Sequence, residues 1–373
     1  MAIRVFVPKE HAAGERRVAI SPPVAVKLKA LGADLLLESG AGTAAGFPDS
    51  LFKDVRLAGA ADGAANADVV FKVLTPLPAN IAHMQPGSVL IGLLNPHKNL
   101  EAVKALRERK VTSFAMELVP RISRAQAMDA LSSQAAAAGY KAALLAAEKL
   151  GRFFPMLTTA AGTIRPAKVL VIGAGVAGLQ AIATARRLGA MVEGYDVRAA
   201  AREQVESLGA KFVDTGVSAE GTGGYARELT AEEKQKQQDA LAKHVAQADA
   251  VITTAAVPGR MAPRIISKIM VEAMKPGAVI LDLAAESGGN CELTKPGEDL
   301  LHGHVLVSGP LNLPSLLAEH ASDMYARNLL NFFTPLVKDG TVHIDWNDEV
   351  YAKSVLTHDG VIKHEPTRRL AEG

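Results

Sequence analysis

The chain has 373 residues, 49% of them hydrophobic and 21% charged, which excludes an intrinsically disordered protein and gives enough length for two domains of ordinary size. Its 41 lysines and arginines nearly balance its 39 aspartates and glutamates. Because neither sign is concentrated in a block, we expect no binding of nucleic acid.

The first third of the chain alternates between apolar strand patterns and amphipathic helix patterns, beginning with a strand rather than a signal peptide. Such alternation predicts a parallel sheet with helices on both faces. The expected strands are residues 3–7, 34–37, 69–73, 88–93 and 112–115, and the expected helices are residues 22–31 and 100–109.

A segment rich in polar and charged residues follows. If it is helical, Gln126, Asp129 and Ser132 recur at three-residue steps and share one face, with Arg121 just before the first turn. That face offers amide, carboxylate and hydroxyl groups to a carboxamide such as nicotinamide, or to an amino acid. The alternative is structural, with Ser123 and Gln126 forming a capping box and Arg121 pairing with Asp129. The residues alone leave both interpretations open.

Residues 134–149 are rich in alanine and predict one long helix. Lys141 and Glu148 interrupt the stretch, which is too short and too polar to cross a membrane, so we expect no direct membrane insertion of this chain. Residues 319–333 predict a second long helix. We expect the two helices to link two Rossmann-like domains of α/β class with parallel sheets and to frame a cleft. The expected domains are residues 1–133 with 320–373, and residues 134–319.

The second domain contains a glycine-rich turn. Residues 169–172 predict a buried parallel strand, and residues 179–188 predict the helix that follows, whose N-terminus would face phosphates. Gly173 and Gly175 allow a tight turn that approaches a pyrophosphate, and Gly178 allows the helix to pack close to its strand. Further strands are expected at residues 191–195, 250–254, 279–282 and 305–307.

Asp196 ends the strand after this turn, where a carboxylate accepts hydrogen bonds from the adenosine ribose hydroxyls. This position favours NAD over NADP. Arg198 instead favours NADP, because an arginine two residues after the aspartate could contact the 2′-phosphate of that cofactor. We give Asp196 the greater weight because its negative charge would repel that phosphate at closer range.

Residues 213–226 are rich in glycine and lack apolar periodicity, and Tyr225 is the only aromatic residue among them. Long loops beside a nucleotide-binding half-fold are often lids, although this composition also suits a disordered connector. After Thr334 the chain is expected to return to the first domain. There, Asp359-Gly360 predicts a hairpin turn between strands at 353–356 and 361–363.

The histidines and the cysteine predict no metal or catalytic site. The ten histidines include no HExxH pattern, and His302 and His304 lack a third partner at metal-ligand spacing, so we expect no metal. A single cysteine, Cys291, cannot form an internal disulfide. It is typical of a reducing, cytoplasmic setting and of a packed small residue rather than a nucleophile.

Several short motifs extend along the chain, and the most specific is the run Arg121-Ile-Ser-Arg-Ala-Gln126. The others are Pro8-Lys-Glu10, Arg17-Val-Ala-Ile-Ser-Pro22, Met116-Glu-Leu118, Leu131-Ser-Ser-Gln134, Thr159-Ala-Ala-Gly-Thr163, Asp196-Val-Arg-Ala199, Gly223-Gly-Tyr-Ala226 and Glu286-Ser-Gly-Gly-Asn290. With these motifs the chain resembles, over nearly its whole length, the NAD(H)-binding component, domain I, of proton-translocating nicotinamide nucleotide transhydrogenases. It is similar, more distantly, to alanine dehydrogenases.

The resemblance implies a protein that holds NADH and passes its hydride directly to NADP⁺ on a partner, while a membrane-spanning subunit couples the exchange to proton translocation. The chain would be active only with the NADP(H)-binding and membrane-spanning subunits. It would be a homodimer, peripheral on the cytoplasmic face of the inner (plasma) membrane.

The resemblance also implies roles for individual residues, with the loop around Tyr225 as a mobile lid over the nucleotide. The residues implied around the nicotinamide are Arg121, Gln126, Asp129 and Ser132. The other implied cofactor contacts are Arg124, Gly173, Ala174, Gly175, Val176, Gly178, Asp196, Val197, Arg198, Gly224, Tyr225 and Ala256.

Alanine dehydrogenase is the rival interpretation. Those enzymes use a lysine and an arginine to hold pyruvate, a histidine as proton donor and an aspartate near the nicotinamide. Arg17 is present, but the other three positions hold Leu74, Asn95 and Glu286. A slip of two residues would restore Lys72 or His97. We expect no metabolite substrate for the chain alone. A non-catalytic NAD(H) sensor is a third hypothesis that the residues do not separate from the first.

Overall fold

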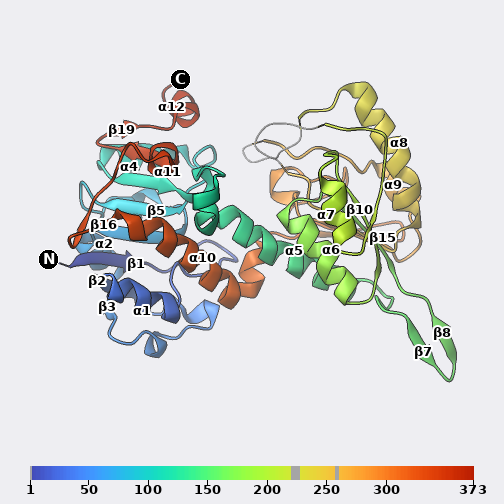
Figure 1. The fold of residues 1–373 in the computed structure, drawn as a ribbon, viewed down its shortest axis with the longest axis horizontal. Coiled ribbons are helices and arrows are strands. Elements are labelled where there is room, and N and C mark those ends of the chain that lie inside the picture. The colour runs from blue at the N-terminus through green and yellow to red at the C-terminus, as the bar shows by residue number, and fades with distance from the viewer. Residues whose placement is uncertain (1, 220–226, 257–259) are drawn as a thin grey trace. The chain divides into compact units, whose positions relative to one another are not determined.

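The computed structural model describes residues 2–219, 227–256 and 260–373, which fold as two compact units. Unit 1 contains Met1–Gln134 and Pro314–Gly373, and unit 2 contains Ala135–Leu313. Each unit is built on a mainly parallel sheet with helices packed against it (Figure 1). The α/β class expected from the sequence is therefore confirmed.

The sheet of unit 1 has eight strands in the order β19-β18-β6-β5-β4-β1-β2-β3. Neighbours are parallel from β6 to β3, and the pairs that involve β18 are antiparallel. The strands are β1 Ile3–Val7, β2 Ala33–Glu38, β3 Arg56–Ala58, β4 Val69–Leu74, β5 Val89–Leu93, β6 Thr112–Ala115, β18 Val355–His358 and β19 Val361–Ile362.

Both faces of this sheet are buried, because side chains of one strand alternate between two apolar layers. Val5 and Val7 of β1 pack with helices α1 and α10, whereas Phe6 packs with α2, α3 and α4. The helices of unit 1 are α1 Pro22–Ala30, α2 Ala60–Asn66, α3 Pro78–Ile81, α4 Leu100–Glu108, α10 Ala318–Phe333, α11 Glu349–Ser354 and α12 Glu365–Glu372.

The chain returns to the sheet of unit 1 near its C-terminal end, where β18 pairs with β6 and β19 pairs with β18. Asp359 and Gly360 connect the two strands with φ values of 46° and 74°, the left-handed pair that a two-residue hairpin turn requires. The strand expected at 353–356 is wrong in its bounds. Helix α11 ends at Ser354, inside that range, and its first turn is capped by the Asp348 carboxylate.

The sheet of unit 2 has seven strands in the order β11-β10-β9-β12-β13-β15-β14, all parallel except for β14 against β15. The strand order reverses between β9 and β12, and ligands of open α/β sheets bind beyond the carboxyl ends of strands at such a reversal. The strands are β9 Lys168–Ile172, β10 Met191–Tyr195, β11 Lys211–Phe212, β12 Ala250–Thr253, β13 Val279–Asp282, β14 Asp299–His302 and β15 Val305–Ser308. The helices are α6 Val176–Arg187, α7 Ala201–Ser207, α8 Ala231–Gln247 and α9 Lys268–Glu272.

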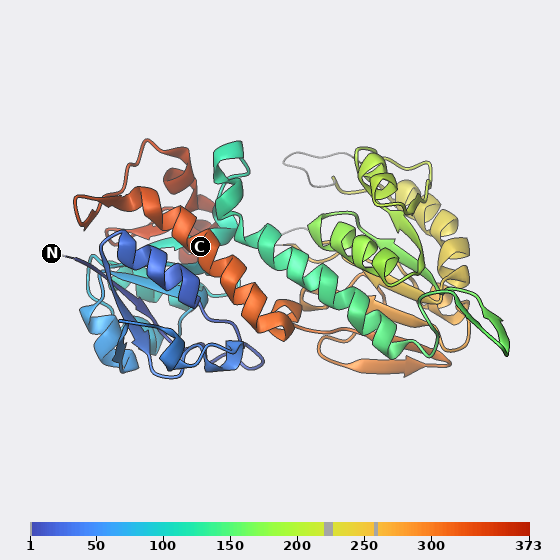
Figure 2. The ribbon, with the colours of Figure 1, turned by 60° about the horizontal axis from the view of Figure 1, so that its bottom comes forward.

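Both long helices expected from the sequence are present, as α5 Ala130–Lys149 and α10 (Figure 2). Helix α8 was not expected. Its buried residues are Gln237, Leu241 and Val245, one per turn, so the helical pattern of apolar residues in its sequence is weak. A capping box between Thr230 and Glu233 defines where the helix begins. The hairpin of β7 Leu157–Thr159 and β8 Gly162–Ile164 was not predicted either. All residues of both strands are exposed, so they show no alternation of apolar and polar residues.

An aromatic cluster packs α10 and α11 against β6 within unit 1, and it gives a test of this packing. Phe332 is fully buried, with its ring centroid 5.3 Å from that of Phe114 and 5.1 Å from that of Tyr351. We expect Phe332→Ala to lower the free energy of unfolding of unit 1 by about 3–5 kcal/mol, through lost burial and a residual cavity. Urea unfolding followed by the fluorescence of Trp346, the single tryptophan, measures it. Leu370→Ala, at a 58% exposed position, is the control and should change the midpoint little.

Candidate functional site

The glycine-rich turn of unit 2 joins β9 to α6 with the geometry expected of a nucleotide-binding turn. Gly173 has a φ of 95°, which favours glycine, and its N–H donates to the Tyr195 carbonyl oxygen at 2.8 Å. A Cβ on Gly178 would lie 1.7 Å from the Gly173 carbonyl oxygen, so only glycine lets α6 sit this close to the strand. Gly175 and Val176 are exposed, whereas Ala174 and Gly178 are buried. The first N–H groups of α6, which lack helical acceptors, therefore lie at an accessible surface.

Asp196 follows β10 and lies beside this turn, with 9% of the residue exposed. Its carboxylate accepts four hydrogen bonds. Oδ1 accepts the backbone N–H of Arg198 at 2.9 Å and the Nε–H of the same residue at 2.8 Å. Oδ2 accepts the Ala174 N–H at 2.7 Å and a terminal nitrogen of Arg198, also at 2.7 Å. This ion pair raises the pKa of the Arg198 guanidinium above its usual value. In the sequence, Asp196 favours NAD and Arg198 favours NADP. In the structure the two side chains form an ion pair with each other.

Two further segments of unit 2 border the turn. Thr254, after β12, donates its hydroxyl to the Gly173 carbonyl oxygen at 3.0 Å, and Ala256, two residues on, is exposed. The backbone of Val197 is hydrogen-bonded to the glycine-rich segment 213–226, because its carbonyl oxygen accepts the Ala219 N–H at 2.8 Å. Gly224 and Tyr225 lie outside the described residues, so their expected contacts stay predictions.

The segment with Gln126, Asp129 and Ser132 in unit 1 differs from the continuous helix expected. Ser123–Met128 is a 3-10 helix without a side-chain cap, which makes the capping box of Ser123 and Gln126 wrong. Asp129 has a non-helical ψ of 88°, and α5 begins after it. Its carboxylate accepts the Ser132 N–H at 2.9 Å and the Ser132 hydroxyl at 2.6 Å.

Asp129 is therefore the N-cap of α5, and Gln126, Asp129 and Ser132 do not lie on one continuous helix. The signal for this was an aspartate three residues before a serine at the start of an alanine-rich run, because aspartate is among the preferred N-cap residues. Gln126 and Arg121 are exposed, and Asp129 and Ser132 are half-buried. Arg124 forms an ion pair with Asp348, with one nitrogen 2.9 Å from Oδ2.

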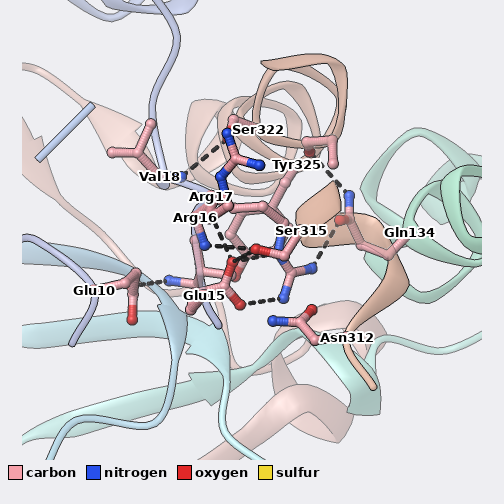
Figure 3. Close-up of polar contacts among 12 residues, drawn as sticks. Glu10, Glu15, Arg16, Arg17, Val18, Gln134, Asn312, Ser315, Ser322 and Tyr325 are labelled. Carbon is pink, nitrogen blue, oxygen red and sulfur yellow. Dashed lines mark hydrogen bonds and ion pairs between the residues drawn. The ribbon is translucent and has the colours of Figure 1, made fainter. Parts of the chain in front are cut away.

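A buried polar network joins the loop after β1 to α5 and α10 within unit 1 (Figure 3). Arg17 donates to Glu15 through Nε at 2.8 Å and through a terminal nitrogen at 2.6 Å, and to the Gln134 side-chain oxygen at 2.8 Å. Ser315 donates to the same Glu15 carboxylate at 3.0 Å. The positive charge of Arg17 is thus compensated by a buried carboxylate of its own unit.

Lys72, inside β4, is compensated in the same way. Its ammonium lies 2.7 Å from a Glu10 carboxylate oxygen, with both side chains buried, and the other oxygen of Glu10 accepts the Val73 N–H at 2.7 Å. Burial raises the pKa of the Glu10 carboxyl, and the Lys72 charge opposes that rise. Leu74 ends β4 and Asn95 follows β5, while His97 is exposed in the loop beyond it.

Among the described residues, no group of three or more histidine, cysteine, aspartate or glutamate side chains is arranged to hold a metal ion. His302 instead lies 3.0 Å from the Glu272 carboxylate. None of the helices within the described ranges is long and apolar enough to cross a membrane.

Sequence reasoning missed two residues that shape the turn. Thr254 gave no signal, because its contact with Gly173 joins two strands separated by a long stretch of chain. Gly139 lies within the alanine-rich α5, where a Cβ would be 2.0 Å from the Ala177 carbonyl oxygen. Because glycine destabilises the interior of a helix, a glycine within this predicted helix was the sign that another element packs closely against it.

Comparison with known proteins places the chain in a family. The family description "Alanine dehydrogenase/PNT, N-terminal domain" matches residues 6–138, and "Alanine dehydrogenase/PNT, C-terminal domain" matches residues 142–365. The chain belongs to the alanine dehydrogenase/PNT family.

Within this family the chain is more similar to a transhydrogenase subunit than to an alanine dehydrogenase. It is 48% identical to the first part of NAD(P) transhydrogenase subunit alpha of Rhodospirillum rubrum, over 97% of this chain and 98% of that protein. It is 29% identical to alanine dehydrogenase of Mycobacterium tuberculosis, over 97% of this chain and 95% of that enzyme. The crystal structure of transhydrogenase from Sinorhizobium meliloti matches with a TM-score of 0.88 and 46% identity, covering 96% of this chain and 99% of that one. The resemblance to the transhydrogenase component is confirmed.

The single cysteine gives a test of the packing beneath this site. Cys291 is 1% exposed, and burial raises the pKa of its thiol from 9.0 to about 11. We expect iodoacetamide at pH 8 to label the native chain far more slowly than the urea-unfolded chain, because the folded state holds a buried, protonated thiol. The folded state favours that protonated form, so its contribution to stability is complete below pH 9 and is lost as the pH rises towards 11. Native and unfolded chains labelled at equal rates would contradict this burial.

Proposed function

We propose that this chain is the NAD(H)-binding component of a proton-translocating transhydrogenase. The observation that carries the proposal is the glycine turn of unit 2 beside a buried Asp196, in a chain 48% identical over nearly its full length to the first part of a transhydrogenase alpha subunit. The chain would exchange hydride with NADP(H) held on a partner subunit, and a membrane-spanning subunit would couple the exchange to proton translocation.

The residues of the turn fit a dinucleotide. An added Cβ on Gly175 would meet no heavy atom within 4 Å, so the backbone there leaves open space for a pyrophosphate. The N-terminal N–H groups of α6, a helix of 12 residues, supply donors and the positive end of a dipole. Asp196 would hold the adenosine ribose by accepting hydrogen bonds from its hydroxyls in place of the Arg198 side chain. NADH, when bound, supplies the hydride.

The proposed reaction needs positioning rather than acid or base catalysis from this chain. A hydride that passes directly between two nicotinamide rings requires no proton transfer by the protein, so orientation and exclusion of water are its main contributions. Arg121, Gln126, Asp129 and Ser132 are proposed to bind the nicotinamide end. Ser132 and Asp129 are bonded to each other, which holds both side chains in one orientation.

The proposed partners follow from the relatives. A relative that is only the first part of an alpha subunit implies further transhydrogenase subunits, and we propose an NADP(H)-binding and a membrane-spanning subunit as partners. The chain itself is proposed to be a homodimer that binds peripherally at the cytoplasmic face of the inner (plasma) membrane.

The environment of two basic residues argues against alanine dehydrogenase. Lys72, the lysine that a shifted alignment would provide, is buried and paired with Glu10, and Arg17 is paired with Glu15. Each cation already has a buried carboxylate partner, so neither has an uncompensated positive charge for the carboxylate of pyruvate to neutralise. Leu74 and Asn95 supply neither an ammonium group nor a general acid.

The proposed function predicts which activities the purified chain has. We expect the purified chain to bind NADH, measured by nucleotide fluorescence, and not to oxidise NADH with pyruvate and ammonium. Hydride exchange with NADP⁺ should begin only when the NADP(H)-binding and membrane-spanning components are added.

The possible results separate the three functions. Absence of NADH binding would reject the proposal. Turnover with pyruvate and ammonium would identify an alanine dehydrogenase. Tight binding without exchange in the reconstituted complex would instead support an NAD(H) sensor.

A pair of glycine variants tests the site. Gly175→Ala should fold with unchanged stability, because the added methyl has open space, but should weaken NADH binding by at least about tenfold by occupying the pyrophosphate position. Gly178→Ala should also lower the free energy of unfolding, by about 1–3 kcal/mol, since its methyl overlaps the Gly173 carbonyl. Fluorescence titration and urea unfolding measure the two effects.

Gly151→Ala is the matched control, with open space and a φ outside the left-handed region, and should change neither quantity. If Gly175→Ala binds NADH as tightly as the wild type, the pyrophosphate does not bind at this glycine.

A further inference from the structure

We propose that Asn290 is a positioning residue for the nucleotide site, acting through the backbone of Ala255 and the hydroxyl of Thr254 on the glycine turn. The inference rests on the proposed binding of NADH at that turn. It gives a physical role to the motif Glu286-Ser-Gly-Gly-Asn290, none of whose residues is among the proposed nucleotide contacts.

The side chain of Asn290 clamps two backbone segments. Its Oδ1 accepts the Ala255 N–H at 3.0 Å, and its Nδ2 donates to the carbonyl oxygens of Ala255 at 2.7 Å and Pro263 at 2.8 Å. With Ala255 the amide thus makes the paired donor and acceptor contact that a neighbouring strand would make. Asn290 is fully buried, and its side chain meets three backbone groups that lie beyond the end of β12.

Asn290 is itself held in place by a buried carboxylate. Asp282, at the end of β13, accepts the backbone N–H groups of Asn290 at 2.7 Å and Cys291 at 3.0 Å through Oδ2. Its two oxygens also receive the hydroxyls of Thr253 and Thr294 and the N–H of Ala284. Five donors satisfy this fully buried carboxylate, so the chain at Asn290 has one well-defined position.

The clamped segment contacts the glycine turn directly. Thr254 precedes Ala255 and donates its hydroxyl to the Gly173 carbonyl oxygen at 3.0 Å, and its N–H donates to the Ile172 carbonyl oxygen at 2.8 Å. A Cβ on Gly173 would lie 2.7 Å from the Thr254 hydroxyl oxygen, and one on Gly178 would lie 3.0 Å from it. Thr254 is therefore in close contact with two of the three glycines, on the side that faces β12.

These contacts form a continuous path from Asp282 through Asn290, Ala255 and Thr254 to the turn. Loss of the Asn290 amide would remove the partners of the Ala255 N–H and carbonyl, and the segment that supports Gly173 would lose its fixed position. Because a site binds a pyrophosphate through backbone N–H groups that must converge, a small displacement of the turn lowers affinity.

The test compares Asn290→Ala with Thr254→Val and with a matched amide control in the full-length chain. Asn99 in unit 1 also clamps backbone, donating to the carbonyl oxygens of Leu94 at 3.0 Å and Asn95 at 3.1 Å, so Asn99→Ala removes a similar interaction away from the turn. We expect Asn290→Ala and Thr254→Val each to raise the Kd for NADH about five- to tenfold, and Asn99→Ala to leave it unchanged. The double variant of Asn290 and Thr254 should lose less than the product of the two single effects.

A saturation experiment separates positioning from general destabilisation. In the complex reconstituted with the partner components, Asn290→Ala should raise the KM for NADH while retaining kcat. If Asn290→Ala lowers the melting temperature as Asn99→Ala does but binds NADH like the wild type, the positioning role is wrong and the proposed function stands. If the wild-type chain does not bind NADH, the proposed function itself fails.

Discussion

The approach of helix α6 to the end of strand β9 is the constraint on which the rest of unit 2 depends. A methyl group on Gly178 would lie 1.7 Å from the Gly173 carbonyl oxygen, and one on Gly139 would lie 2.0 Å from the Ala177 carbonyl oxygen. The first turn of α6 is thus held between the strand end and α5 by backbone contacts that only glycine permits. Since the N–H groups of that turn are the proposed pyrophosphate donors, close packing and ligand binding use the same geometry.

Buried carboxylates then fix the segments around the turn. Asp196 accepts the Ala174 N–H as well as three bonds from Arg198, and Asp282 accepts five donors, all of them uncharged hydroxyl or backbone N–H groups. A buried carboxylate is costly unless its lone pairs are filled, so each one selects a single arrangement of the donors around it. Asp196 combines this structural role with a proposed role in ribose binding, which is possible because the Arg198 side chain is partly exposed and can be replaced.

Unit 1 also depends on buried charged groups that are paired with each other. Its buried cations Arg17 and Lys72 are each neutralised by a nearby glutamate, and their contacts link the loop after β1 to β4 and α5. In an interior, breaking such a pair leaves an uncompensated charge. Arg17 and Lys72 are therefore part of the buried polar structure of unit 1.

The sequence by itself determined the alternation of strands and helices, the glycine-rich turn and the place of Asp196 after the next strand, because these depend on local periodicity and on glycine at fixed spacing. It also allowed the hairpin at Asp359-Gly360, since two-residue turns have a local code. Only the tertiary structure decided that Asp129 ends one helix and caps the next, that Arg198 is bonded to Asp196, and that Asn290 and Thr254 support the turn. Some of those contacts join residues that are distant in the chain, as between Asn290 and Ala255. Others join near neighbours, for which the sequence allowed more than one hydrogen-bonding partner, and the observed partner depends on packing in the folded chain.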